Sequence, residues 1–189
     1  MSLQIPQQHT VETPEAMEEL GRYIGRMLRA GDLLVLTGAL GAGKTTLTRG
    51  IGDALVVRGP VTSPTFVLAR THPSLNGGPA LVHVDAYRLG SALELDDLDI
   101  DFAHSIVVVE WGSGMLEGVS ESWLDVVIDR PTGAASGGAS GEVAFGSIGV
   151  GDAGDFAGAG DDDDVVDALD APEPRTVTMM GHGPRWSAL

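Results

Sequence analysis

The chain has 189 residues and no cysteine, and its 27 acidic side chains outnumber its 11 lysines and arginines, giving a formal net charge of -16. This composition excludes disulfides and thiolate metal sites, and so acidic a chain is not expected to hold nucleic acid by itself, because cationic groups dominate that contact. The sequence has no run of about 18 apolar residues that would span a membrane, and its first residues lack the charged and then apolar pattern of a signal peptide. We therefore expect a cytoplasmic protein with no membrane contact.

The first predicted element is a helix of about 17 residues that begins at Pro14. Thr13 is a suitable N-cap, and proline is favoured at the first helical position. Apolar residues then recur at helical spacing over 17–28, and Gly31 follows as a stop signal.

A short apolar strand is predicted at 32–37, followed by Gly38-Ala-Leu-Gly-Ala-Gly43-Lys44-Thr45. This run has the Gly-x4-Gly-Lys-Ser/Thr pattern of a phosphate-binding loop, and Lys44 is the only lysine in the chain. Residues 46–55 then carry apolar side chains on one helical face. Strand, glycine loop and helix therefore follow in the order that a phosphate-binding loop requires.

Each part of this loop has a physical task. The glycines allow several backbone N–H groups to face one phosphate, and the helix N-terminus adds partial positive charge. The Lys44 ammonium is expected to neutralise β and γ phosphate oxygens, and the Thr45 hydroxyl to complete a Mg²⁺ shell.

Two further apolar strands are predicted at 80–84 and 105–109, and an acidic residue ends each of them. Because ligands bind beyond the carboxyl ends of strands in open α/β sheets, Asp85 and Glu110 are expected beside the glycine loop. One of them is expected to serve Mg²⁺ and the other to polarise the attacking water. The alternative for either residue is a strand-end acid that caps the next helix.

Several other residues have two readings. In the turn at 63–66, Thr65 either contributes a hydroxyl to the metal shell or belongs to a simple proline-led turn. His83 shares a strand face with Asp85 and either faces the site or is a core residue. Trp111 and Trp123 are interpreted as core or interface aromatics.

The second half of the chain changes character. A strand is predicted at 123–128, and the stretch between Pro131 and Pro174 has ten glycines and no lysine or arginine. We interpret 131–174 as a disordered insertion, since it has little apolar bulk to offset its ordering entropy. Residues 175–180 resume strand character and are expected to return to the sheet edge. The predicted division is therefore a core at 1–130, an insertion at 131–174 and a final strand within 175–189.

Together these elements predict an α/β fold, a P-loop NTPase-like three-layer arrangement with a mostly parallel central sheet and antiparallel edge additions. The glycine loop, Ser63-Pro-Thr-Phe66, His83-Val-Asp-Ala-Tyr-Arg-Leu89 and Val109-Glu-Trp111 resemble, in this order and spacing, the motifs of the TsaE (YjeE) family. This is a family of small bacterial P-loop ATPases. The resemblance covers about residues 10 to 130.

The resemblance implies a function in tRNA modification. Members assist the threonylcarbamoyl-transferase heterodimer, which makes threonylcarbamoyladenosine beside the anticodon of tRNAs that read codons beginning with A. A protein of this family is expected to bind ATP and Mg²⁺, to be a weak ATPase that the heterodimer activates, to meet tRNA only through that complex, and to be monomeric alone.

The same resemblance assigns site residues by position. It gives phosphate binding to Gly41, Ala42, Gly43, Lys44, Thr45 and Thr46, metal binding to Thr45 and Glu110, and catalytic roles to Asp85 and Lys44. Tyr87, Arg88 and Trp111 match motif positions that support the site or contact a partner. Met17 departs from the family pattern, since relatives often have threonine there, and the motifs do not account for the long insertion.

Two other functions use the same kind of loop. A small-molecule or nucleoside kinase needs an acceptor pocket and a lid with several arginines, of which only Arg88 lies in a suitable motif. A nucleotide-dependent docking module without catalysis is the non-enzymatic alternative. A GTPase is disfavoured, because the usual guanine-reading loop needs a second lysine.

Overall fold

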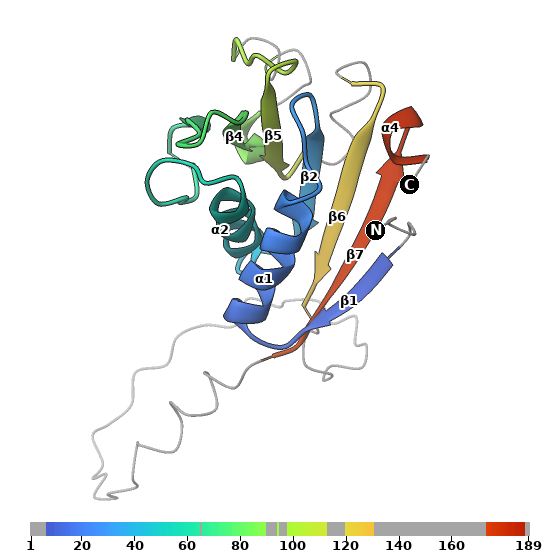
Figure 1. Ribbon diagram of the computed structural model, residues 1–189. Helices are drawn as coiled ribbons and strands as arrows, with labels where there is room; N and C mark the ends of the chain where they lie inside the picture. The colour runs from blue at the N-terminus through green and yellow to red at the C-terminus, as the bar shows by residue number, and fades with distance from the viewer. Residues whose placement is uncertain are drawn as a thin grey trace, which may run out of the picture. The chain divides into compact units, whose positions relative to one another are not determined.

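The computed structural model describes residues 7–64, 66–89, 94, 98–112, 120–130 and 173–187. A seven-stranded sheet with the order β1-β7-β6-β2-β5-β4-β3 forms its centre (Figure 1). The strands are β1 (Gln7–Val11), β2 (Leu33–Gly38), β3 (Ala69–His72), β4 (Ala80–Asp85), β5 (Ser105–Glu110), β6 (Trp123–Asp129) and β7 (Arg175–His182). They are accompanied by helices α1 (Pro14–Gly25), α2 (Lys44–Ala54) and α4 (Pro184–Ser187) and by the 3-10 helix η1 (Ala86–Arg88). None of the described helices is long and apolar enough to cross a membrane.

The middle of the sheet is parallel, and its outer strands are antiparallel. Strands β6, β2, β5 and β4 run in the same direction, whereas β3 and β7 pair antiparallel with β4 and β6. This arrangement confirms the predicted α/β fold. It also brings the carboxyl ends of the parallel strands to one edge, where Gly38 ends β2 and where Asp85 and Glu110 are register partners at the ends of β4 and β5.

The two faces of the sheet have separate apolar cores. Leu34 and Leu36 of β2 point to the face that α1 and α2 cover, together with buried residues of both helices. Leu33 and Val35 point to the opposite face, where they pack with residues of β4 and β5 and with Ile100 and other loop residues. Central strands that are buried on both faces have continuous apolar sequences for this reason.

Helices α1 and α2 cross at very short range, because glycines form the contact. A Cβ on Gly21 of α1 would lie 2.2 Å from the Leu47 carbonyl oxygen, and one on Gly50 of α2 would lie 2.0 Å from the Glu18 carbonyl oxygen. The crossing therefore leaves no room for any side chain at these two positions. It fixes the position of α2, whose first residue is Lys44.

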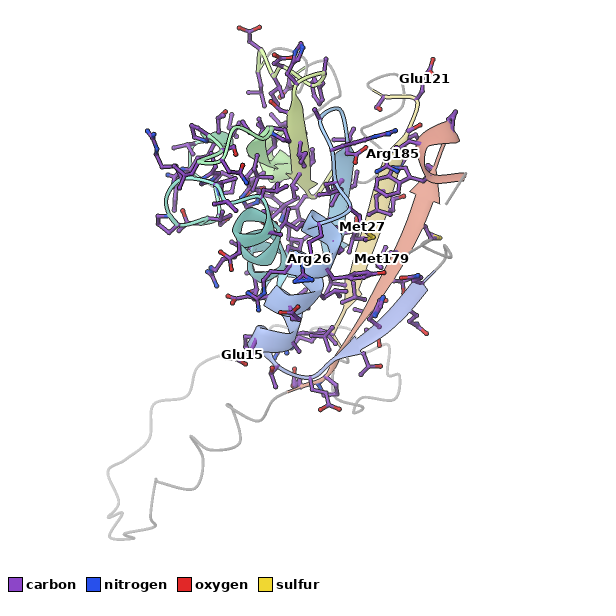
Figure 2. The ribbon with its side chains drawn as sticks, viewed as in Figure 1. Glu15, Arg26, Met27, Glu121, Met179 and Arg185 are labelled. Atoms are coloured by element: carbon purple, nitrogen blue, oxygen red, sulfur yellow. The ribbon has the colours of Figure 1, made fainter. Side chains whose placement is uncertain are left out.

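A buried ion pair holds helix α4. The Nε of Arg185 lies 2.9 Å from Oδ1 of Asp32, and Nη2 lies 3.1 Å from Oδ2. The same Nη2 donates to the Met27 carbonyl at 3.1 Å, and Figure 2 shows Arg185 reaching toward Met27. Because the Asp32 side chain is only 3% exposed, this contact fastens α4 to the turn between α1 and β2.

The structure corrects two sequence-based predictions. Helix α1 has 12 residues rather than about 17, because Met27 N–H and Leu28 N–H bond to carbonyls three residues back and the helical ladder ends. Strand β7 is not at the sheet edge, since β1 pairs with it on the side away from β6. Residues 131–172 of the predicted insertion lie outside the described residues.

Candidate functional site

The glycine loop joins β2 to α2 and is built on left-handed backbone. Gly41 has a φ of 75° and Gly43 a φ of 109°, a region that side chains rarely tolerate. Gly43 is also the N-cap of α2, and no side chain caps this helix. The first backbone N–H groups of α2 therefore face the carboxyl edge of the sheet, and no side chain caps them.

Lys44 bends back over the loop. Its Nζ donates to the Gly38 carbonyl at 2.9 Å and to the Ala39 carbonyl at 3.1 Å, and lies 3.8 Å from the centroid of the Trp111 ring. Burial lowers the pKa of Lys44, and the nearby charges of Glu110 and Asp85 partly oppose this effect. The direct contacts of this ammonium with described residues are neutral carbonyls and a ring face, which it can exchange for anionic oxygens.

Thr45, Glu110 and His83 form a hydrogen-bonded chain beneath the loop. The Thr45 hydroxyl donates to Oε1 of Glu110 at 3.0 Å, and Nε2 of His83 lies 2.8 Å from the same oxygen. Glu110 is 4% exposed and His83 is fully buried. The carboxylate is therefore held by the phosphate-loop helix on one side and by β4 on the other.

Asp85 is a helix cap, as one of the two interpretations predicted, and it also faces a cavity. Its Oδ1 accepts a hydrogen bond from the Tyr87 N–H at 3.0 Å, so Asp85 is the N-cap of η1. It also lines the cavity beside the glycine loop together with Glu110. The cap bond at Oδ1 fixes the orientation of the carboxylate that lines the cavity.

Two cavities meet at the glycine loop. The acidic cavity, of about 280 Å³, is lined by Leu40, Gly41, Gly43, Lys44, Thr45, Thr46, Ser63, Asp85, Glu110 and Trp111. The helix-side cavity, of about 240 Å³, is lined by Thr13, Pro14, Met17, Gly41, Gly43, Thr46 and Arg175. Gly41, Gly43 and Thr46 line both cavities, so the two cavities adjoin at the glycine loop and the first turn of α2.

Most of the predicted site residues lie together around the two cavities, and Ala42 is the exception. Ala42 lines neither cavity: its side chain is fully buried in the core, and its N–H donates to the Ala39 carbonyl at 3.1 Å. Thr65 lies outside the described residues, and the structure describes only the backbone of Arg88. Tyr87 is 71% exposed and meets the Trp111 ring edge-on at 5.6 Å.

Sequence reasoning missed the residues that reach the site from distant elements. Trp111 is not one of them, because the resemblance already gave its position to site support or partner contact, and its ring covers the Lys44 ammonium. Thr13 and Arg175 come from the start of α1 and the start of β7. No local pattern marks them, because only the strand order β1-β7-β6-β2 brings them near the loop.

A strand, glycine loop and helix at the carboxyl edge of a parallel sheet define the class of P-loop proteins. Within this class, the chain belongs to the TsaE family: the family model described as "Threonylcarbamoyl adenosine biosynthesis protein TsaE" matches residues 11–135.

Individual relatives agree with this assignment. A Streptomyces coelicolor protein named tRNA threonylcarbamoyladenosine biosynthesis protein TsaE is 61% identical over 120 residues, which cover 62% of this chain and 81% of the relative. The Bacillus subtilis protein of the same name is 33% identical over 120 residues, covering 62% and 73%. The crystal structure of Bacillus subtilis YdiB matches the fold with a TM-score of 0.59 and 24% identity, covering 98% of this chain and 93% of that one.

Proposed function

We propose that this protein binds ATP with Mg²⁺ and hydrolyses it as an accessory protein in the formation of threonylcarbamoyladenosine in tRNA. One observation carries the proposal: the acidic cavity joins the Lys44 ammonium, the Thr45 hydroxyl and the carboxylates of Asp85 and Glu110 at the N-terminus of α2. This is the set of groups that phosphoryl transfer from a nucleotide needs.

The donor set suits Mg²⁺. The Thr45 hydroxyl donates its hydrogen bond to Glu110, so its oxygen keeps lone pairs for a cation on the cavity side. Among the described residues no group of three or more His, Asp or Glu side chains is arranged to hold a metal alone. Mg²⁺ fits such a site, because it usually takes only one or two protein ligands and completes its shell with water and phosphate. When bound, it supplies charge that neutralises phosphate oxygens.

The two cavities suggest how the nucleotide lies. The acidic cavity contains the carboxylates that would serve the metal and the water, so it takes the β and γ phosphates. The helix-side cavity continues from the same glycines and contains Met17, Pro14 and Arg175, so it takes the nucleoside end. In this orientation the loop N–H groups and Lys44 hold the phosphates between the two cavities.

Asp85 is the residue that we assign to the attacking water. Its cap bond with the Tyr87 N–H holds the carboxylate in place. There it would accept a hydrogen bond from a water aligned with the γ phosphate. Lys44 stabilises the charge that develops on the phosphate oxygens. These roles make Asp85 and Lys44 the catalytic residues of the proposal.

The surroundings of the acidic cavity support a protein partner. Leu40 at its rim is 88% exposed, and Phe66 in the next loop is 89% exposed. Apolar side chains that are exposed together beside a cavity are suited to contact with a protein partner. The partner that we propose is the threonylcarbamoyl-transferase heterodimer, and the net charge of -16 supports contact with tRNA only through that complex.

The test is phosphate release from ATP by the protein alone and with the purified heterodimer. We expect slow release alone and clear stimulation by the heterodimer, which Asp85→Asn abolishes while the variant still binds ATP. Consumption of ATP that appears only with a small acceptor, with ADP formed but no free phosphate, would instead indicate a kinase, because the phosphoryl group then goes to the acceptor. Binding of ATP with no release in any mixture would indicate a docking module.

A further inference from the structure

His83 is a fully buried histidine on one of the two outer strands of the four parallel strands. It belongs to β4, where it lies between Leu81 and Asp85 on the face toward α2. Its Nε2 lies 2.8 Å from Oε1 of Glu110 on the neighbouring strand. A histidine of the core is thus in direct contact with a residue of the proposed metal site.

The contact determines which ring nitrogen carries the proton. A carboxylate only accepts hydrogen bonds, so Nε2 of His83 must be the donor in the bond to Glu110. Nδ1 is then an acceptor, and it has no hydrogen-bond partner among the described residues. Burial of an imidazole with one bare nitrogen is unfavourable, and an aliphatic side chain would suit the surrounding core better. The bond to Glu110 is the one polar contact that the described residues offer His83.

Two donors converge on one oxygen of Glu110. The Thr45 hydroxyl reaches Oε1 from the start of α2, and His83 reaches it from β4. Two bonds from different elements prevent the side chain from rotating, and they occupy Oε1. The second oxygen, Oε2, is then the one whose direction is set for the metal and its water shell.

His83 also keeps Glu110 from a competing partner. Glu110 is close enough to Lys44 to raise the pKa of its ammonium. Without the hydrogen bond from His83, the Glu110 carboxylate would be drawn toward Lys44. It would then pair with the ammonium that the phosphates require.

We propose that His83 is a positioning residue that holds the Glu110 carboxylate in the orientation that serves Mg²⁺ in the nucleotide complex. The inference rests on the proposed function, because it concerns the metal of the same site. It assigns no contact between His83 and the nucleotide. The histidine acts through Glu110 alone, so its loss should change the Mg²⁺-dependent part of binding and spare the rest.

Three substitutions separate position from packing. In His83→Gln the amide nitrogen can take the place of Nε2 and still donate, whereas in His83→Asn the amide is one bond shorter and corresponds to Nδ1. His83→Leu removes all donors and keeps apolar bulk. The matched control is His72→Leu, because His72 is a second buried histidine, 4% exposed, on the adjacent strand β3 with no described bond to Glu110.

The measurement is the affinity for ATP at a series of Mg²⁺ concentrations, with Mn²⁺ electron paramagnetic resonance as a direct reading of metal binding. His83→Leu and His83→Asn should raise the metal concentration at half effect by about tenfold, with affinity in the absence of metal unchanged. His83→Gln and His72→Leu should stay close to wild type. Should His83→Leu not fold, the Gln and Asn variants decide the matter by themselves.

Three results would overturn the inference. The first is wild-type metal dependence in His83→Leu, or in His83→Asn if the Leu variant does not fold. The second is an equal loss of metal affinity in His83→Gln and His83→Asn. The third is a loss in His72→Leu as large as that in His83→Leu. A nitrogen-15 spectrum of the nucleotide-free protein gives an independent reading, since it should show a proton on Nε2 of His83, and a ring whose Nε2 carries no proton would also overturn the inference. Failure of the proposed function is distinguishable, because the wild type would then show no Mg²⁺-dependent ATP binding at all.

Discussion

Gly50 is the position where α2 approaches the backbone of α1 most closely, and Gly50→Ala tests whether this crossing determines the stability of the fold. The added Cβ would lie 2.0 Å from the carbonyl oxygen and 2.9 Å from the Cα of Glu18. Both atoms belong to the backbone, so no rotamer change relieves the contact. Since real Cβ atoms essentially never come within 3.0 Å of such neighbours, the two helices must separate by about 1 Å.

The expected cost follows from two opposing terms. Overpacking of a tight contact costs about 1–3 kcal/mol, and a clash with backbone belongs at the upper end. Alanine returns about 1 kcal/mol through its better helix propensity. We therefore expect the free energy of unfolding to fall by about 2 kcal/mol.

Urea unfolding followed by circular dichroism measures this difference. The matched control is Gly52→Ala in the same helix, whose Cβ would meet side-chain atoms of Val61 at 2.7 Å and of Val57 at 3.2 Å. It has the same gain in propensity, but side chains can yield more easily than backbone, so the loss should be smaller. The reasoning is refuted if Gly50→Ala is as stable as wild type or no less stable than Gly52→Ala.

Three other predictions concern the site, the ion pair and the long insertion. Glu110→Ala should chiefly remove the effect of Mg²⁺ on ATP binding, whereas Asp85→Ala should lower phosphate release far more than affinity; calorimetry and a release assay separate them, and the opposite pattern would reverse the two roles. Arg185→Ala leaves the buried Asp32 carboxylate unpaired and should cost about 3 kcal/mol in urea unfolding, and a loss below about 1 kcal/mol would show that the pair is not needed. Deletion of 135–170 should leave ATP binding intact, because β6 and β7 pair along their whole length and a short turn can join them; loss of the fold on deletion would show that the segment is structural.

The sequence was sufficient for the elements that are buried on both sides. All six residues of β5 are buried, so the apolar run at 105–109 predicted the strand, and the acid that ended the run marked the edge of the sheet. Strand β3 was not predicted, because two of its four residues, Arg70 and Thr71, are exposed and the strand is an outer one. Strand β1 was not predicted either, because its sequence is mostly polar and lacks the apolar pattern of a strand.

The length of α1 shows a different limit. Met27 and Leu28 continue the helical spacing of apolar residues and pack against the core, although the helix has already ended. Periodicity reports which side chains are buried, and a tight turn after a helix buries them as well.

The site was predictable where its chemistry is local. The glycine loop contains Lys44 and Thr45 in one continuous motif, and Asp85 and Glu110 each end an apolar run. The contacts of His83 and Trp111 depend instead on the register between β4 and β5 and on the path of the chain after β5. A register shift of one residue would remove the bond between His83 and Glu110, and sequence patterns do not fix register to that precision.

The central claim is that the glycine loop and the acidic cavity bind ATP with Mg²⁺, and calorimetric titration of the protein with ATP tests it most directly. The account predicts one site per chain, tighter with Mg²⁺ than without, and a loss of about 3 kcal/mol, or about a hundredfold in affinity, in Lys44→Ala as the charged hydrogen bonds to phosphate disappear. A wild-type protein that takes up no ATP, or a Lys44→Ala variant that binds it as well as wild type, would contradict the account.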